Sequence, residues 1–317
     1  MHRIRDSVLA VAAAALTLTC VTTGCSGKGA QAESQAQTQA RRPISYIDSW
    51  GVKGDGPGQM EQPIAIATDV LGNVYLPDAG NHFIDKFNWE GRPLFAYEEE
   101  MLKNPQSITV DSGGAIYVTD SGRSSVLVFL PNGDRYHEIK LKSRANSENT
   151  IGVAVGEDGL IHVLDPIAES VATYTAAFRM IRAWQPVASG PNARVRGTSI
   201  AVGPDGYLYI LDPAGNRIVR FTEDGHCVSE ISAIAGGAAR RLSDEFAVAG
   251  GYIFAMDADG RMLHVWSVEG KAKLDLDLAT ELGQGNRPAP ALAVSSRKEL
   301  LVLDSSGSRV LRYQINF

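Results

Sequence analysis

The chain has 317 residues, a formal net charge of −6 and 7% aromatic residues. This length is sufficient for one large domain with a substantial core. Because phosphate binding needs a basic face, the acidic balance does not support a nucleic-acid-binding protein. Frequent glycine (32 residues) beside 14 prolines indicates many short turns rather than long helices.

Residues 1–24 are predicted to be a signal peptide. After a short, mildly basic start comes VLAVAAAALTLT (8–19), an apolar run of 12 residues that is too short to span a bilayer. VTTGC follows and ends at Cys25. It resembles the lipobox of bacterial lipoproteins, although Thr22 stands where leucine is usual. The alternative is an ordinary signal peptide with an incidental cysteine.

The lipobox resemblance implies a lipid, with its palmitate-type chains, on Cys25. Such a lipid anchors a protein to a membrane that the chain does not span. Ser26 stands after the cysteine, which resembles the pattern for outer-membrane sorting. The expected location is therefore the bacterial cell envelope, at the outer membrane. Residues 25–43 hold few large apolar side chains and are predicted to be a flexible tether.

A pattern that first appears as VYLPDAGNHFIDKF (74–87) occurs six times in the chain, counting this copy. Each copy has an aspartate at the same place, 42 to 47 residues from the next, with an aromatic residue nine positions later. A period in the forties with several strand-length runs per unit is typical of a propeller blade. The six aspartates are Asp78, Asp120, Asp165, Asp212, Asp257 and Asp304.

Each unit contains four predicted strands separated by turns such as GPDG and TEDG, which favour antiparallel hairpins. The sixth unit ends at Phe317 after its third strand, and ISYIDSW (44–50) has strand composition. We therefore predict an all-β fold, a six-bladed β-propeller over residues 44–317. Its last blade is completed by the strand at about 44–50, which closes the ring and removes open edges.

The repeats resemble the NHL family of six-bladed β-propellers. The resemblance rests on WGVKGDGPGQMEQPIAIATD (50–69) and on the loops Gly80-Asn81-His82 and Gly215-Asn216-Arg217. It implies the fold for residues 44–317. It also implies one of several functions, because propellers of this family bind proteins or RNA, act as sensors outside bacterial cells, or are related to a peptide-amidating lyase.

The repeated aspartates are interpreted as turn-fixing residues, because one active site does not need six equivalent copies. Each carboxylate is expected to accept bonds from loop N–H groups or from an arginine such as Arg217 or Arg309. A cation held by some of these oxygens in the central channel is the alternative. No catalytic residue, cofactor or metal site is predicted, and the lone Cys227 is taken as a strand thiol rather than a nucleophile.

The lyase alternative needs several histidine ligands around a metal. His82, His137, His162, His226 and His264 occupy different positions within their units, so convergence on one ion is not expected.

Long connections between units depart from the repeat, and loops on a rigid scaffold commonly carry binding sites. These connections contain a basic set in an otherwise acidic protein: Arg144, Arg194, Arg196, Arg240 and Arg241. We interpret the set as a partner-binding face, and the alternative is that it is solvated surface charge. The predicted function is non-catalytic binding by a membrane-tethered, monomeric propeller acting as a scaffold or sensor. Its expected partner is an envelope protein, or an anionic glycan or lipid. The alternatives are the metal-dependent lyase and a glycan or small-ligand binder at the channel mouth.

Overall fold

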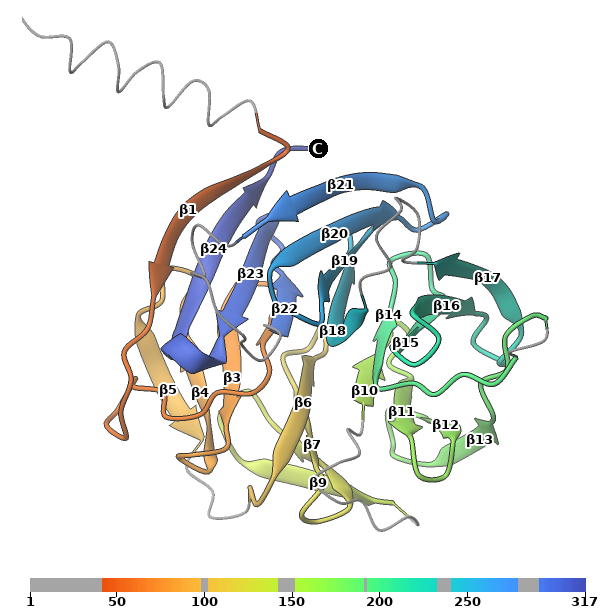
Figure 1. Cartoon of the computed structure of the whole chain (residues 1–317). Helices are drawn as coiled ribbons and strands as arrows, with labels where there is room; N and C mark the ends of the chain where they lie inside the picture. The colour runs from red at the N-terminus through yellow and green to blue at the C-terminus, as the bar shows by residue number, and fades with distance from the viewer. Residues whose placement is uncertain (1–41, 98–101, 142–151, 191–192, 233–240, 279–290) are drawn as a thin grey trace, which may run out of the picture. The chain divides into compact units, whose positions relative to one another are not determined.

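The computed structural model describes residues 42–97, 102–141, 152–190, 193–232, 241–278 and 291–317. Residues Pro43–Phe317 form one compact unit. Its strands make six four-stranded antiparallel sheets arranged as the blades of a propeller (Figure 1). The predicted all-β class and six-bladed architecture are therefore confirmed. The one helical element in the described residues is a short 3-10 turn, η1 (Ser305–Gly307).

In every blade the strands follow one another from the centre of the ring outward. Blade 1 holds β2 (Ala67–Thr68), β3 (Val74–Asp78), β4 (Phe83–Phe87) and β5 (Pro93–Tyr97). Blade 2 holds β6 (Pro105–Val110), β7 (Ile116–Asp120), β8 (Ser125–Phe129) and β9 (Arg135–Lys140). Blade 3 holds β10 (Gly152–Val155), β11 (Ile161–Asp165), β12 (Ser170–Tyr174) and β13 (Met180–Trp184).

The second half of the ring repeats this order. Blade 4 holds β14 (Ser199–Val202), β15 (Leu208–Asp212), β16 (Arg217–Phe221) and β17 (Cys227–Ser232). Blade 5 holds β18 (Leu242–Ala249), β19 (Tyr252–Asp257), β20 (Met262–Ser267) and β21 (Ala272–Asp277). Blade 6 holds β22 (Ala291–Val294), β23 (Glu299–Asp304) and β24 (Arg309–Ile315), with β1 (Ile44–Trp50) as its outer strand.

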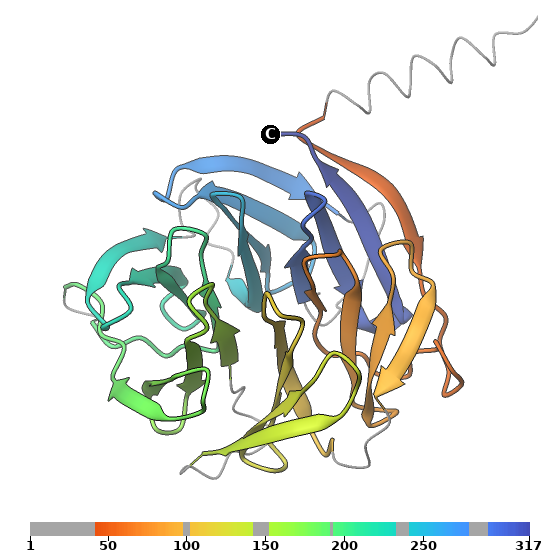
Figure 2. The same ribbon diagram turned by 180° about the vertical axis from the view of Figure 1, so that it is seen from behind.

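Strand β1 closes the ring, as the sequence predicts. It pairs antiparallel with β24, so the two ends of the compact unit share one blade (Figure 2). The Asp48 carboxylate accepts two bonds from the Arg312 guanidinium, at 2.7 and 2.6 Å. The Trp50 ring packs against Phe87 of blade 1 with centroids 4.8 Å apart. The strand therefore stabilises both its own blade and the interface with the next.

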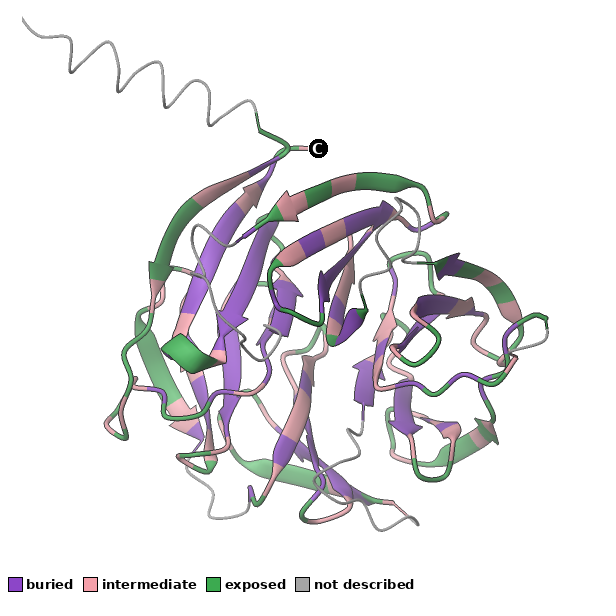
Figure 3. Ribbon diagram, in the orientation of Figure 1, coloured by how far each residue is buried: buried purple, intermediate pink, exposed green. Residues whose placement is uncertain are grey.

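The core consists of six apolar clusters, and each cluster fills the interface between two neighbouring blades. The second and third strands supply most of it, whereas the outer strands are mostly exposed (Figure 3). The repeated aromatic residue is buried in five blades, with Tyr174 half-buried. Burial of rings at equivalent positions explains why the aromatic recurs at a fixed offset.

Candidate functional site

Each of the six repeat aspartates is the last residue of its blade's second strand and is buried. All six lie on one face of the propeller, because the second strands run in the same direction from the centre of each blade. The same face carries the connections between blades, and we call it the Asp face. The structure thus brings together on one face the aspartates and the described parts of the connections, which hold Arg194, Arg196 and Arg241.

The aspartates of blades 1 and 2 bind the segment that enters their own blade. Two backbone N–H groups of that segment donate to each carboxylate, which fixes the inner strand's approach. Asp78 accepts from Glu61 (2.7 Å) and Gln62 (2.9 Å), and Asp120 accepts from Lys103 (2.7 Å) and Asn104 (3.1 Å).

The other four aspartates bind mainly within the loop that follows them. Asp165 accepts from the backbone N–H groups of Ile167 (3.0 Å) and Ala168 (2.9 Å), and Asp257 accepts from those of Arg261 (2.8 Å) and Met262 (2.9 Å). Asp212 and Asp304 each accept from an arginine Nε at 3.0 Å, from Arg217 and Arg309 respectively.

Those loops also share a backbone conformation that the sequence pattern did not reveal. Four residues after the aspartate, five blades place a non-glycine residue in the left-handed region, with φ between 47° and 65°. Blade 5 uses Gly260 one position earlier. Left-handed backbone is strained for most side chains, so a bonded carboxylate beside it gives the turn a fixed shape. The five residues are His82, Ser124, Glu169, Asn216 and Ser308.

A second repeated contact lies on the opposite face, where the first and second strands of a blade are joined. A tyrosine hydroxyl of the second strand donates to an aspartate of the joining turn: Tyr75 to Asp69 (3.0 Å), Tyr117 to Asp111 (3.1 Å) and Tyr209 to Asp205 (2.6 Å). His162 takes the tyrosine's place in blade 3 and contacts Thr173 Oγ1 instead, at 3.1 Å. Burial lowers the pKa of His162 to about 4, so it is neutral at physiological pH.

The connection between blades 3 and 4 is held by one arginine. Nη1 of Arg217 donates to Glu230 (2.8 Å) and Nη2 donates to the carbonyl oxygen of Arg194 (3.0 Å), while its Nε reaches Asp212. Val195 of the same connection is buried between the blades. This connection therefore has a fixed path where it reaches the Asp face.

The predicted basic residues fall into three groups. Arg194 forms an ion pair with Glu169, so its charge is compensated. Arg196 and Arg241 are exposed, and neither has an ion pair with another described residue. They precede β14 and β18, the inner strands of adjacent blades. Arg144 and Arg240 lie outside the described residues.

The histidines do not converge. His82 is exposed, His137 stacks on Phe178 with centroids 4.0 Å apart, and His264 Nδ1 lies 2.7 Å from Asp275. Within the described ranges no three His, Cys, Asp or Glu side chains are grouped so that they could hold a metal ion. The metal-dependent lyase therefore has no ligand set in this part of the chain.

The described residues also include no helix of the length and apolarity needed to cross a membrane.

The inner strands surround a central cavity of about 200 Å³. Among the described residues that line it, the only ionisable one is Glu245 of β18. Sequence reasoning missed this residue, although a signal was present: the five equivalent positions in the other blades hold Ala, Ser or Gly.

Comparison with known proteins supports the fold. The NHL repeat family model matches residues 102–129. A streptogramin B lyase is similar in structure, with a TM-score of 0.61 and 16% identity over 86% of this chain and 97% of that chain. Virginiamycin B lyase from Staphylococcus aureus gives 0.58 and 14%, over 86% and 98%. A protein of unknown function from Bacteroides thetaiotaomicron gives 0.60 and 12%, over 86% and 75%.

The comparison with curated proteins gives no match. The structural similarity shows a shared propeller fold. Because the sequence identities are this low, function has to be argued from the site itself.

Proposed function

We propose that this chain is a lipid-tethered, non-catalytic binding propeller of the bacterial cell envelope. It would bind an acidic surface of an envelope protein through the Asp face, at the connections that carry Arg196 and Arg241. The tether would be residues 25–43, with the lipid on Cys25.

The observation that carries the proposal is the uncompensated charge of these two arginines. The protein has a net charge of −6, and most arginines for which the structure gives a contact bind a carboxylate, as Arg194, Arg217 and Arg312 do. Arg196 and Arg241 have no such partner in the described ranges, and both precede rigid inner strands. Exposed cations on a fixed scaffold favour association with a complementary acidic surface and speed its encounter.

Charge reversal tests the face. The double variant Arg196→Glu/Arg241→Glu should lose a partner that co-purifies with the full chain from crosslinked membranes, because its affinity should fall at least about tenfold, or roughly 1.4 kcal/mol. The matched control is Arg179→Glu, because Arg179 is exposed in the turn between β12 and β13 on the opposite face. Equal recovery from both variants would contradict the proposed face. Arg144 and Arg240 can then be reversed in the same assay.

The tether is tested separately with Cys25→Ala. Because the lipid would be the anchor, this variant should move from the membrane fraction to the soluble fraction while its circular dichroism spectrum stays that of a β-propeller. Unchanged membrane association would reject the lipid on Cys25 without affecting the argument for the Asp face.

A further inference from the structure

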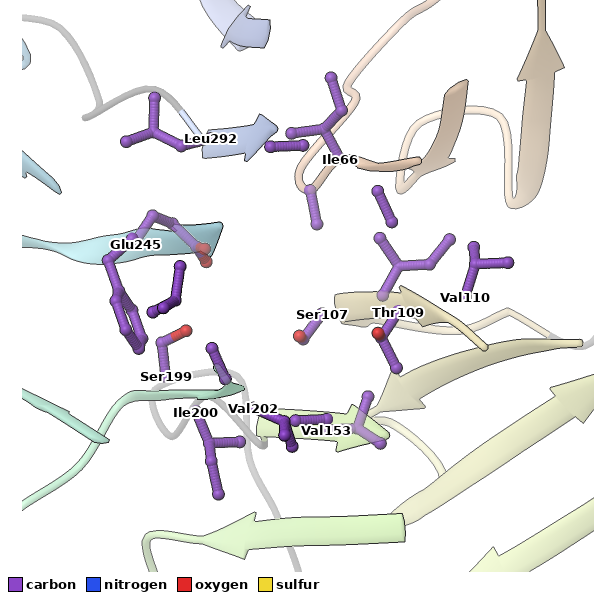
Figure 4. A pocket seen from close by; sticks show the side chains of 18 of the residues that line it. Ile66, Ser107, Thr109, Val110, Val153, Ser199, Ile200, Val202, Glu245 and Leu292 are labelled. Carbon is purple, nitrogen blue, oxygen red and sulfur yellow. The ribbon is translucent and has the colours of Figure 1, made fainter. Parts of the chain in front are cut away.

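The central cavity has one carboxylate among residues that are otherwise uncharged. The lining is mostly alanine, valine and isoleucine, supplied by the inner strands of all six blades. Figure 4 shows the Glu245 carboxyl group and the hydroxyl groups of Ser107 and Ser199 pointing toward the open centre from different strands. Three oxygen-bearing side chains thus face one small space.

The fold does not need a glutamate at this position. Glu245 directly precedes Phe246, which pairs with Ala255, and so stands at the first of four positions that recur in every inner strand. The register of β18 against β19 shifts between Leu242 and Phe246, and a bulge of this kind re-aims a side chain. The equivalent residues of the other blades are all small: Ala65, Ser107, Gly152, Ser199 and Ala291.

The part of the chain that the structure describes gives the carboxylate of Glu245 no counterion. Among the described residues, no hydrogen bond or ion pair engages this carboxylate or the hydroxyls of Ser107 and Ser199. Polar groups removed from bulk water without partners are costly. Adjacent inner strands β14 and β22 contribute no charged residue, and Asp212 and Asp257 at the ends of β15 and β19 are bound to their own loops.

The electrostatics agree with this geometry. Burial, and secondarily the neighbouring Asp244, raises the pKa of Glu245 from 4.5 to about 8. The Glu245 side chain is half-buried. It faces the cavity on one side, and protein surrounds the rest of it. A cation that enters the cavity would therefore displace a proton from this group near neutral pH.

We propose that the cavity binds the primary ammonium group of a small alkylamine, with Glu245 as its counterion. The Ser107 and Ser199 hydroxyls accept the remaining N–H groups. The single negative charge of the carboxylate balances the single positive charge of one ammonium group. A calcium or magnesium ion prefers six or more oxygen ligands and usually several carboxylates, which this lining does not provide. An anion would meet no cationic side chain in the lining.

Calorimetry with propylammonium as the probe tests the proposal, using the full chain above pH 8. Wild type and the control Glu157→Gln, an exposed turn residue, should bind it equally. Glu245→Gln keeps the shape but loses the charge, so binding should weaken at least about tenfold. 1-Propanol, the neutral analogue, should not bind. Equal affinity in Glu245→Gln, or equal binding of propanol, would overturn the proposal.

A second measurement remains valid even if the variant does not fold. Carboxyl-carbon NMR of the wild type should show the pKa of Glu245 falling when propylammonium is added, because the cation stabilises the ionised form. An unchanged titration would mean that the cavity holds water only and would overturn the proposal. Replacing propylammonium by Nα-acetyl-lysine methylamide distinguishes the source of the amine. Binding of both probes indicates that a lysine side chain can enter, and binding of propylammonium alone indicates a free amine.

Discussion

At the scale of single residues, departures from the repeat carry information that the repeat itself does not. Asp85 in β4 is buried, and its Oδ2 atom has no hydrogen-bond partner among the described residues. Desolvation, and then the nearby Asp78, raises its pKa from 3.8 to about 7. Four of the equivalent residues in the other blades are apolar and the fifth is histidine: Leu127, Ala172, Val219, Leu311 and His264.

This carboxyl group should make stability fall as pH rises. Its pKa is higher in the folded state, so between pH 3.8 and about 7 the folded state binds the proton that the unfolded state has lost. Asp85→Leu should remove the decline and raise the free energy of unfolding at pH 8 by roughly 2 to 4 kcal/mol.

Urea denaturation at pH 5 and pH 8 measures this effect. The exposed Asp55→Asn is the control and should follow the wild type at both values. If the difference in free energy of unfolding between Asp85→Leu and the wild type were the same at pH 5 and pH 8, the assigned ionisation of Asp85 would be contradicted.

The sequence was sufficient to find the six aspartates but not Asp85 or Glu245. A residue that recurs at a fixed offset is visible in the sequence alone, as Asp78 and its equivalents are. An unusual residue has meaning only when strand pairing shows which positions are equivalent and which side chains face inward. For Glu245 a bulge in β18 intervenes, so simple alternation along the strand does not give its direction.

At the scale of elements, the connection between blades 3 and 4 depends on Arg217. The sequence suggests the bond to Asp212, since the two residues flank one short loop. The contacts with Glu230 and with the Arg194 carbonyl could not be predicted, because they join segments whose approach is set by blade packing.

Arg217→Met should therefore destabilise the protein by about 3 kcal/mol, because the buried Asp212 carboxylate loses its counterion. The amide of Val195, which donates to the Pro186 carbonyl at 3.1 Å, should exchange faster with solvent by hydrogen-exchange mass spectrometry. Arg182→Met is the control: Arg182 lies 3.5 Å from Glu223 in a solvent-exposed pair, and its loss should cost less than about 1 kcal/mol. Equal losses of stability would show that the network does not hold the connection.

At the scale of the whole molecule, the repeat and its closure followed from the sequence, whereas the binding surfaces did not. The chain has six units of similar length, and the last unit lacks its fourth strand. The segment ISYIDSW (44–50) therefore has few other places to pair than the open edge of that last unit. The central cavity is different because each inner strand contributes only a few residues and successive contributions lie about 45 residues apart in the chain. Its shape therefore depends on how all six blades tilt toward the axis.

Closure by β1 should determine whether the ring holds together. Ile44 is buried against blades 5 and 6, whereas Ile47 on the same strand is 40% exposed. Ile44→Asp would bury an unpaired charge and should lower the free energy of unfolding by at least about 3 kcal/mol, while Ile47→Asp should change it by less than about 0.5 kcal/mol. Because loss of β1 exposes the edge of β24, Ile44→Asp should also associate into larger species by light scattering. If both variants were equally stable and monomeric, β1 would not be the strand that secures the ring.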